Sequence, residues 1–141
     1  DNKMIAVSDK NIMVFDGSQK PKLKQKIKLG KQIDSVFYNN KYIGIAYSNN
    51  DKKCTSHIKL YDFNGKMLME NDTSIAYRNI EFDSNNEVCV TGESACEIYT
   101  IHGVKKFYHT FDQKLYKVMY KSGINNYIFI YEGAMDEVRL K

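Results

Sequence analysis

The sequence predicts an all-β chain of the β-propeller class, with four blade-like units that form part of a larger ring. Strand-forming residues are abundant, with 11 Tyr and 7 Phe among 141 residues, while Pro occurs only once. Similar apolar strands recur about every 40 residues, which is the period of a four-stranded propeller blade. Turns rich in Gly, Asn and Asp separate these strands, as expected for antiparallel hairpins.

Two strand types mark the repeat independently. The first type is centred on Ile5, Ile43, Val88 and Ile128. The second type follows each of these after a turn and is centred on Val14, Leu60, Ile98 and Leu140. No segment carries a sustained apolar stripe of helical period, so we expect essentially no helix. A β-sandwich or a closed barrel is the alternative fold, but neither gives a reason for a period of about 40 residues.

The repeat divides the chain into one propeller segment with units at about 1–30, 31–72, 73–112 and 113–141. Strands are expected at 3–9, 11–16 and 22–29 in the first unit, at 32–38, 41–48, 56–62 and 66–71 in the second, at 75–82, 86–92, 95–101 and 104–111 in the third, and at 115–121, 127–132 and 135–140 in the fourth. The first unit lacks an innermost strand and the fourth an outermost one. An open row of blades would expose apolar flanks, so we expect missing blades or self-association to complete a ring.

Charge and motifs exclude several function classes. The formal net charge is +4, and only Arg78 and Arg139 supply the planar guanidinium that specific nucleic-acid readers prefer. No apolar run is long enough to span a membrane. The sequence has no GxSxG elbow, no phosphate-binding glycine loop and no Cys/His metal spacing, so no catalytic, metal or cofactor-binding residue is predicted.

Some polar residues resemble metal-binding or catalytic residues, and we interpret them as structural. The segment 83–87 has alternating oxygen side chains, but it lacks the glycine and the final acid of a calcium loop, so a turn is expected. His57, His102 and His109 are scattered and are expected to be exposed and without function.

A run of alternating lysines is the one candidate binding feature. Lys22, Lys24, Lys26 and Lys28 alternate with other residues and are preceded by Lys20. A period of two would place these lysines on one face of the outermost strand of the first unit. That stripe is a possible anion-binding site for an acidic polymer or lipid surface. The favoured interpretation is edge protection, because lysines on an edge strand discourage strand pairing between molecules.

Cysteines are few and odd in number, which is not a disulfide framework. Cys89 and Cys96 are expected to face each other across a hairpin whose turn is centred between Gly92 and Glu93. Bridges between directly opposed strand positions are usually strained, so we predict two free thiols. Cys54 is the third cysteine.

Several segments resemble a known family. They are the hairpin at 57–66, which contains IKLYD, and the stretches 76–83, 96–100, 103–107, 109–112 and 138–141. Together they are similar to the C-terminal part of an uncharacterised β-propeller family, a domain of unknown function in membrane-anchored proteins of Gram-positive gut bacteria. The resemblance implies an extracellular or cell-surface location, with an anchor and earlier blades that this chain lacks. The shared motifs are structural and transfer no catalytic residue.

The sequence therefore predicts a non-catalytic extracellular propeller module that binds or scaffolds a protein or a surface polymer at a bacterial cell surface. Membrane contact is expected only through the absent anchor, and no cofactor or specific nucleic acid is expected. Two alternatives stay open. One is a fragment of a propeller-type carbohydrate-active enzyme, and the other is an electrostatic binder of anionic polymers through the lysine-rich strand.

Overall fold

The fold consists entirely of antiparallel sheets in the residues that the structure describes. This computed structural model describes residues 2–17, 19–48 and 56–141. Within them the chain forms fourteen strands and no helix. Accordingly, the described part offers no helix with the length and apolar character to cross a membrane. The predicted all-β class is confirmed.

Four small sheets follow one another along the chain, each a simple meander of consecutive strands. The first contains β1 (Lys3–Ser8), β2 (Asn11–Asp16) and β3 (Lys22–Lys28). The second contains β4 (Ser35–Tyr38), β5 (Tyr42–Ser48), β6 (Ser56–Asp62) and β7 (Met67–Thr73). The third contains β8 (Asn79–Phe82), β9 (Val88–Thr91), β10 (Ala95–Tyr99) and β11 (Lys105–Thr110). The fourth contains β12 (Leu115–Tyr120), β13 (Asn126–Tyr131) and β14 (Ala134–Arg139).

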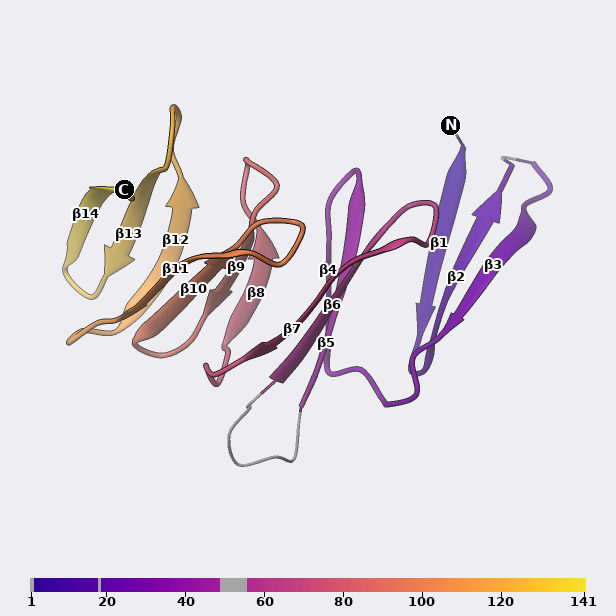
Figure 1. The fold of residues 1–141 in the computed structure, drawn as a ribbon, viewed down its shortest axis with the longest axis horizontal. Helices are drawn as coiled ribbons and strands as arrows, with labels where there is room; N and C mark the ends of the chain where they lie inside the picture. Colours follow the sequence, from indigo (N-terminus) through magenta and orange to yellow (C-terminus); the bar gives the residue numbers. More distant parts are fainter. Residues whose placement is uncertain (1, 18, 49–55) are drawn as a thin grey trace.

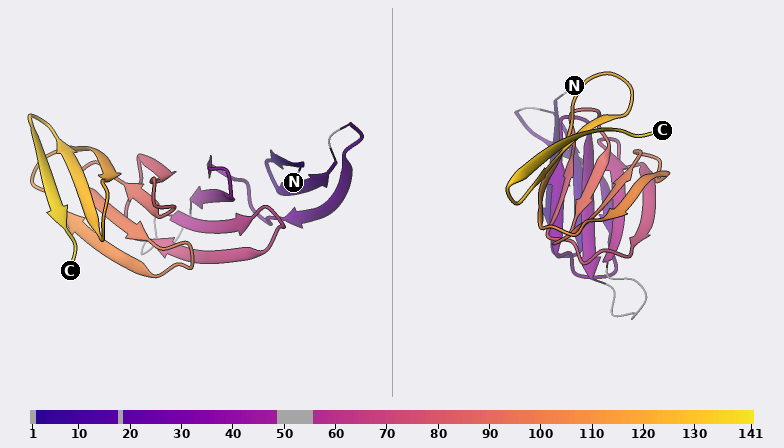
Figure 2. Two further views of the ribbon diagram at one scale, coloured as in Figure 1. Left: turned by 90° about the horizontal axis from the view of Figure 1, so that it is seen from above. Right: turned by 90° about the vertical axis from the view of Figure 1, so that its left-hand side faces the viewer.

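The sheets stand face to face in a row, with the two chain ends at opposite ends of the row (Figure 1). Seen from above, the row curves into an open arc (Figure 2). The first strands of the second and third sheets lie on the same side of the row, since β4 contacts β8. Near them, the side-chain amide of Asn39 donates a 3.0 Å hydrogen bond to Asn86 Oδ1. Each sheet therefore presents its broad faces to its neighbours in the row.

Three apolar clusters fill the spaces between successive sheets. Ile12 and Leu29 pack with Ile43 and Ile45 between the first and second sheets. The second and third sheets enclose Phe37, Ala46, Ile58, Leu60, Met69, Ile75, Ile80, Val88, Val90 and Tyr99. The third and fourth enclose Cys89, Cys96, Ile98, Leu115, Val118, Tyr127 and Phe129.

The two middle sheets bury both faces, which explains why their central strands are apolar without alternation. All four residues of β9 are buried, and Val88 and Val90 face the second sheet while Cys89 faces the fourth. In β5, Ile43 and Ile45 face the first sheet while Ala46 faces the third. The end sheets differ, because Met4 in the first sheet and Met119 and Met135 in the fourth are 47%, 44% and 67% exposed.

Side-chain oxygens at the predicted turns hold the hairpins closed. Asp62 Oδ1 accepts hydrogen bonds from the backbone N–H groups of Asn64 and Lys66 at 2.8 and 2.9 Å. Asp83 Oδ1 does the same for Asn85 and Glu87, both at 2.8 Å. These short-range bonds are the usual reason for Asp and Asn in turns. The turn predicted at 83–87 is confirmed.

Glycines in two turns also permit close contact between neighbouring sheets. Gly65 and Gly103 both adopt positive φ, at 81° and 80°. Gly65 lies against the Gln25 side chain of the first sheet, and Gly103 lies against Asn71 of the second. Since the same kind of turn touches the outer strand of the preceding sheet in both cases, the contact belongs to the repeat.

Candidate functional site

The predicted lysine stripe lies on β3, an edge strand, but its side chains do not share one face. A bulge interrupts the pairing of β2 with β3: Val14 lies opposite Gln25, whereas the next residue, Phe15, lies opposite Leu23. Lys24 is the extra residue, and Lys22 is therefore on the opposite face from Lys26 and Lys28. The expectation of a single lysine face is wrong, because the bulge adds one residue to the strand and reverses its alternation.

The lysines of β3 are all exposed, and Lys24 forms an ion pair with Asp16 at 3.3 Å. The edge position agrees with edge protection, and the broken stripe disperses the charge that a polyanion would contact. Anion binding by Lys22, Lys24, Lys26 and Lys28 stays a prediction.

The two described cysteines lie close in the fold but not face to face. Cys89 is opposite Ile98, and Cys96 is opposite Thr91. The predicted opposition is wrong because the hairpin turn is centred one residue later than expected: Gly92 N–H donates to Ala95 O at 2.8 Å, which leaves Glu93 and Ser94 as the turn. Both cysteines are free, as predicted, and buried. Burial raises the pKa of the Cys96 thiol to about 12. Cys54 lies outside the described residues.

The three histidines have different surroundings. His102 is exposed in the turn between β10 and β11. The expectation of an exposed side chain is wrong for His57, which is only 18% exposed. Its Nε2 lies 3.0 Å from Glu70 Oε1, and its Nδ1 contacts Asp72. Its hydrogen bond, followed by that of Lys59, holds the pKa of Glu70 below its usual range. His109 lies in a groove that the sequence did not reveal.

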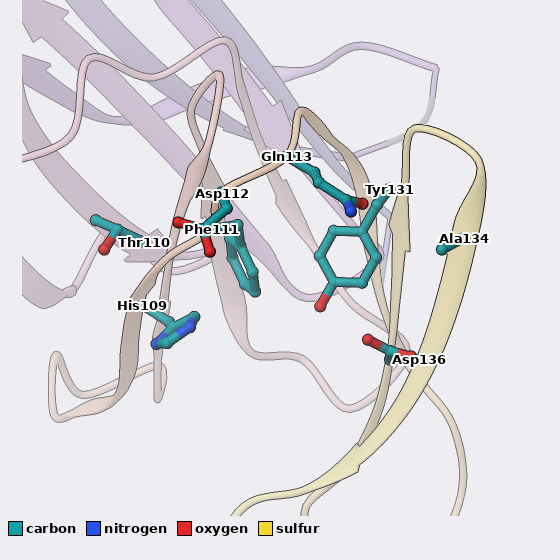
Figure 3. Close-up of a pocket in the computed structure, with 8 residues that line it drawn as sticks. All are labelled: His109, Thr110, Phe111, Asp112, Gln113, Tyr131, Ala134 and Asp136. Atoms are coloured by element: carbon teal, nitrogen blue, oxygen red, sulfur yellow. The ribbon is translucent and has the colours of Figure 1, made fainter.

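This groove lies at the outer side of the interface between the third and fourth sheets (Figure 3). One part is a cavity of about 290 Å³ lined by the end of β11, the segment after it, and the β13–β14 hairpin. An adjoining part of about 240 Å³ shares His109, Phe111 and Tyr131 with it. We call the two parts together the outer groove.

Aromatic rings form the floor of the outer groove. Phe111 is central: its ring centroid lies 4.7 Å from His109, 5.6 Å from Phe129 and 5.2 Å from Tyr131. Phe107 extends the row, with its centroid 5.5 Å from Phe129. Phe107 and His109 come together because alternate residues of a strand share a face, and Phe111 continues this alternation directly after the end of β11. The rings offer a flat apolar surface to an extended ligand.

Polar groups border the aromatic floor. Asp112 and Gln113 follow β11, and Asp136 projects from β14 beside Tyr131 (Figure 3). Burial, followed by the negative charge of Asp136, raises the pKa of the Tyr131 hydroxyl. A groove with an apolar floor and carboxylates at its border is suited to an extended ligand that carries both apolar and basic groups.

The opposite end of the same interface holds a separate polar network. The Lys106 ammonium contacts Glu87, donates to Asn125 Oδ1 at 2.8 Å, and lies 3.1 Å from the Tyr127 hydroxyl. The Tyr127 hydroxyl donates to the other Glu87 oxygen. Because every member of this network has partners and Glu87 is buried, its role is to join the two sheets rather than to bind a ligand.

In the described residues, no three His, Cys, Asp or Glu side chains converge to hold a metal ion. Among the described carboxyl groups, Asp83 has a strongly shifted pKa, which burial raises to about 6. Asp83 lies outside the outer groove.

A comparison with known protein families assigns the chain to one of them. A family model covers residues 1–140 and is described as a family of unknown function, DUF5711. The chain belongs to the DUF5711 family. No curated protein matches it. The predicted relationship to an uncharacterised family is thus confirmed, over nearly the whole chain.

In this DUF5711 chain the groove residues carried only a weak sequence signal. Phe107, His109 and Phe111 alternate along one strand, which is detectable, but the pattern is equally typical of a packed face. Tyr131 and Asp136 are distant in sequence and join them only because the fourth sheet packs on the third.

Proposed function

We propose that the four sheets are consecutive blades of a β-propeller, and that the chain is a non-catalytic binding or scaffolding module at a bacterial cell surface. The observation that carries the proposal is that the second and third sheets each bury both faces against a neighbouring sheet. Sheets stacked face to face, each a four-stranded meander, are the construction of a propeller.

The open arc also supports a larger ring. The end sheets have one neighbour each, and exposed Met4, Met119 and Met135 lie on them. Apolar surface of this kind favours burial against a further blade or a second copy of the chain. Surface attachment rests on the resemblance of the sequence to membrane-anchored proteins.

Binding is supported by the outer groove, which combines an aromatic floor with carboxylates. A crosslinking experiment in producing cells tests it. A photoreactive p-benzoylphenylalanine replaces the exposed groove residue Ala134, and the control places it at His102, which is exposed in the β10–β11 turn. We expect a discrete crosslinked adduct from the groove position alone. In a second experiment, protease is added outside intact cells, and we expect it to digest the protein.

The two readouts test separate parts of the proposal. Full protection from external protease would refute the surface location. Adducts of equal yield from both positions would show that the groove has no selective partner, and would refute the binding role of this site.

A carbohydrate-active enzyme is the second candidate, because the carboxyl groups of Asp112 and Asp136 line one groove together with Tyr131. Glycoside cleavage uses a pair of carboxyl groups. Release of reducing sugar from cell-wall polysaccharide, lost in both Asp112→Asn and Asp136→Asn, would establish this activity. Absence of any release would leave binding as the function.

A further inference from the structure

A pocket of about 350 Å³ lies between the first and second sheets, where the β6–β7 turn meets the first sheet. Its lining consists of Lys3 of β1, residues 14–16 of β2, residues 24–25 of β3 and residues 63–64 of the turn, and we call it the lysine pocket. A further strand of the first sheet would lie beside β1, on the side away from β2, and a further blade would pack on the opposite face of that sheet. Neither would cover the lysine pocket, so the pocket is compatible with a larger ring.

Two lysines of this pocket occupy positions that recur in the repeat. In each of the first three sheets, a bulge between the last two strands adds one residue to the outer strand, and these added residues are Lys24, Leu68 and Lys106. The second position directly precedes the residue that pairs with the next strand beside the bulge, and it holds Lys3, Tyr42 and Glu87. The same pair of positions can therefore be compared at three interfaces.

The other two interfaces fill this pair of positions with side chains that attract each other. Between the second and third sheets, Tyr42 and Leu68 pack on the apolar cluster, and the Tyr42 ring centroid lies 6.0 Å from that of Phe82. Between the third and fourth sheets, the Lys106 ammonium pairs with the buried Glu87 carboxylate. Between the first and second sheets both positions hold lysine. Because two ammonium groups repel each other, this interface has a pocket where the others are closed.

One positive charge of the lysine pocket has no negative partner among the described residues. Lys24 forms an ion pair with Asp16 at 3.3 Å. Lys3 forms no ion pair within the part of the chain that the structure describes, and its ammonium contacts the uncharged side-chain oxygen of Asn64. A ligand that carries a single negative charge would neutralise the pocket.

Aromatic rings and an amide supply further contacts for such a ligand. Phe15 of β2 and Phe63 of the β6–β7 turn line the same pocket and offer apolar surface. Asn64 uses its side-chain oxygen to accept from Lys3, so its Nδ2 group can donate to an oxygen of the ligand. Apolar walls with a few polar groups are typical of small-molecule sites, and the volume lies at the lower end of their range.

We propose that the lysine pocket binds a small organic anion that has one carboxylate group and a flat apolar body. The carboxylate lies between Lys3 and Lys24, and the apolar body lies against Phe15 and Phe63. A monoanion matches the single uncompensated charge better than a phosphate dianion does. The site lies at a different interface from the outer groove, so the inference goes beyond the function proposed above and does not depend on it.

The probe is phenylacetate, titrated into the full chain and followed by amide NMR. We expect saturable shifts at Val14, Gln25 and Asn64 in the millimolar range, as is usual for so small a ligand. 2-Phenylethanol has a similar apolar body without the charge, and it should bind about ten-fold more weakly. Phenyl phosphate, a dianion at pH 7.5, should bind no more tightly than phenylacetate.

Three variants test the role of Lys3. Lys3→Gln should weaken phenylacetate binding about ten-fold, because it removes a charge-assisted hydrogen bond. Lys26→Gln is the matched control, since Lys26 is exposed on the opposite face of β3, and it should leave binding unchanged. Lys3→Glu reproduces the charges of Glu87 and Lys106, and should abolish binding because an internal ion pair with Lys24 takes the place of the ligand. Urea unfolding checks that each variant is folded.

Absence of saturable shifts at the pocket would overturn the proposal, and so would equal binding of phenylacetate and 2-phenylethanol, a comparison that needs no variant. Equal weakening by Lys3→Gln and Lys26→Gln would replace a site with general attraction to the basic strand. Tighter binding of phenyl phosphate would overturn the assignment to carboxylates. The crosslinking test at Ala134 concerns the other interface, so failure of the lysine pocket and failure of the outer groove are separate results.

Discussion

Asn71 Nδ2 donates a 2.9 Å hydrogen bond to the carbonyl oxygen of Gly103, and so joins the outer strand of the second sheet to a turn of the third. This bond depends on a turn that has no side chain at position 103, because a Cβ there would lie 2.5 Å from Asn71 Oδ1. The contact is one way in which the repeat fixes the spacing of neighbouring sheets.

Gly103→Ala should destabilise the chain more than Gly133→Ala. Both glycines have positive φ, at 80° and 77°, so both alanines carry backbone strain of roughly 1 kcal/mol. Only the alanine at 103 would also displace Asn71, since nothing lies within 4 Å of a Cβ at 133. Urea unfolding of the two variants gives the difference, and equal losses would show that the Asn71 contact contributes nothing.

Lys106→Met should destabilise the chain by about 3 kcal/mol, because it leaves the buried Glu87 carboxylate without its cation. Glu87→Gln in the same chain should recover part of the loss, since the neutral amide removes the unpaired charge. Unfolding free energies from a double-mutant cycle measure the coupling between the two residues. Simple additivity of the single changes would contradict the network.

Asp83 should make the chain less stable as the pH rises through the acid range. Burial raises its folded pKa to about 6, above its ordinary value of 3.8, although backbone hydrogen bonds oppose the shift. The folded state then binds the proton more tightly than the unfolded state, so this contribution is present below pH 4 and is lost as the pH rises toward 6. Its Oδ2 is buried without a hydrogen-bond partner in the described structure, which fits a group that favours the neutral form.

Asp83→Asn is the control for this pH dependence, because an amide oxygen can still accept the two turn hydrogen bonds. Chemical denaturation between pH 4 and pH 7 should show the unaltered chain losing stability relative to the variant. Parallel curves for the two proteins would show that Asp83 titrates normally.

Cys89 and Cys96 should be inert in the folded chain. Both thiols are buried, and burial raises the pKa of each, so little thiolate is present at neutral pH. In a Cys54→Ser variant without reductant, a thiol reagent should modify neither cysteine before unfolding and both after it. Failure of either to react in denaturant would reveal a disulfide.

Local sequence chemistry predicted the order of strands well, because the alternation of apolar residues and the Asp, Asn and Gly turns act within one hairpin. It was wrong at two places where a shift of one residue changes which side chains face each other. The turn after β9 is centred on Glu93 and Ser94, and the bulge at Lys24 reverses the face of Lys22. Both shifts depend on backbone geometry that residue types do not specify, and each moves side chains to new partners.

The outer groove was beyond sequence reasoning for a different reason. Its residues belong to two sheets, and Asp136 and Tyr131 of the fourth sheet meet Phe111 only after the fourth sheet has packed on the third. Predicting it would require the spacing between sheets, which contacts such as Asn71 with Gly103 determine.

The row of sheets also determines how the chain should come apart. Each sheet touches only the sheets beside it, so stability becomes a sum of single-sheet and nearest-neighbour contributions, as in linear repeat proteins. Loss of structure should then begin at either terminus, where β1 and β14 belong to sheets with one neighbour, and proceed inward toward β5 and β9. Amide hydrogen exchange would follow this order as a gradient of protection, with the weakest protection in the two terminal sheets and stronger protection wherever a further blade covers them.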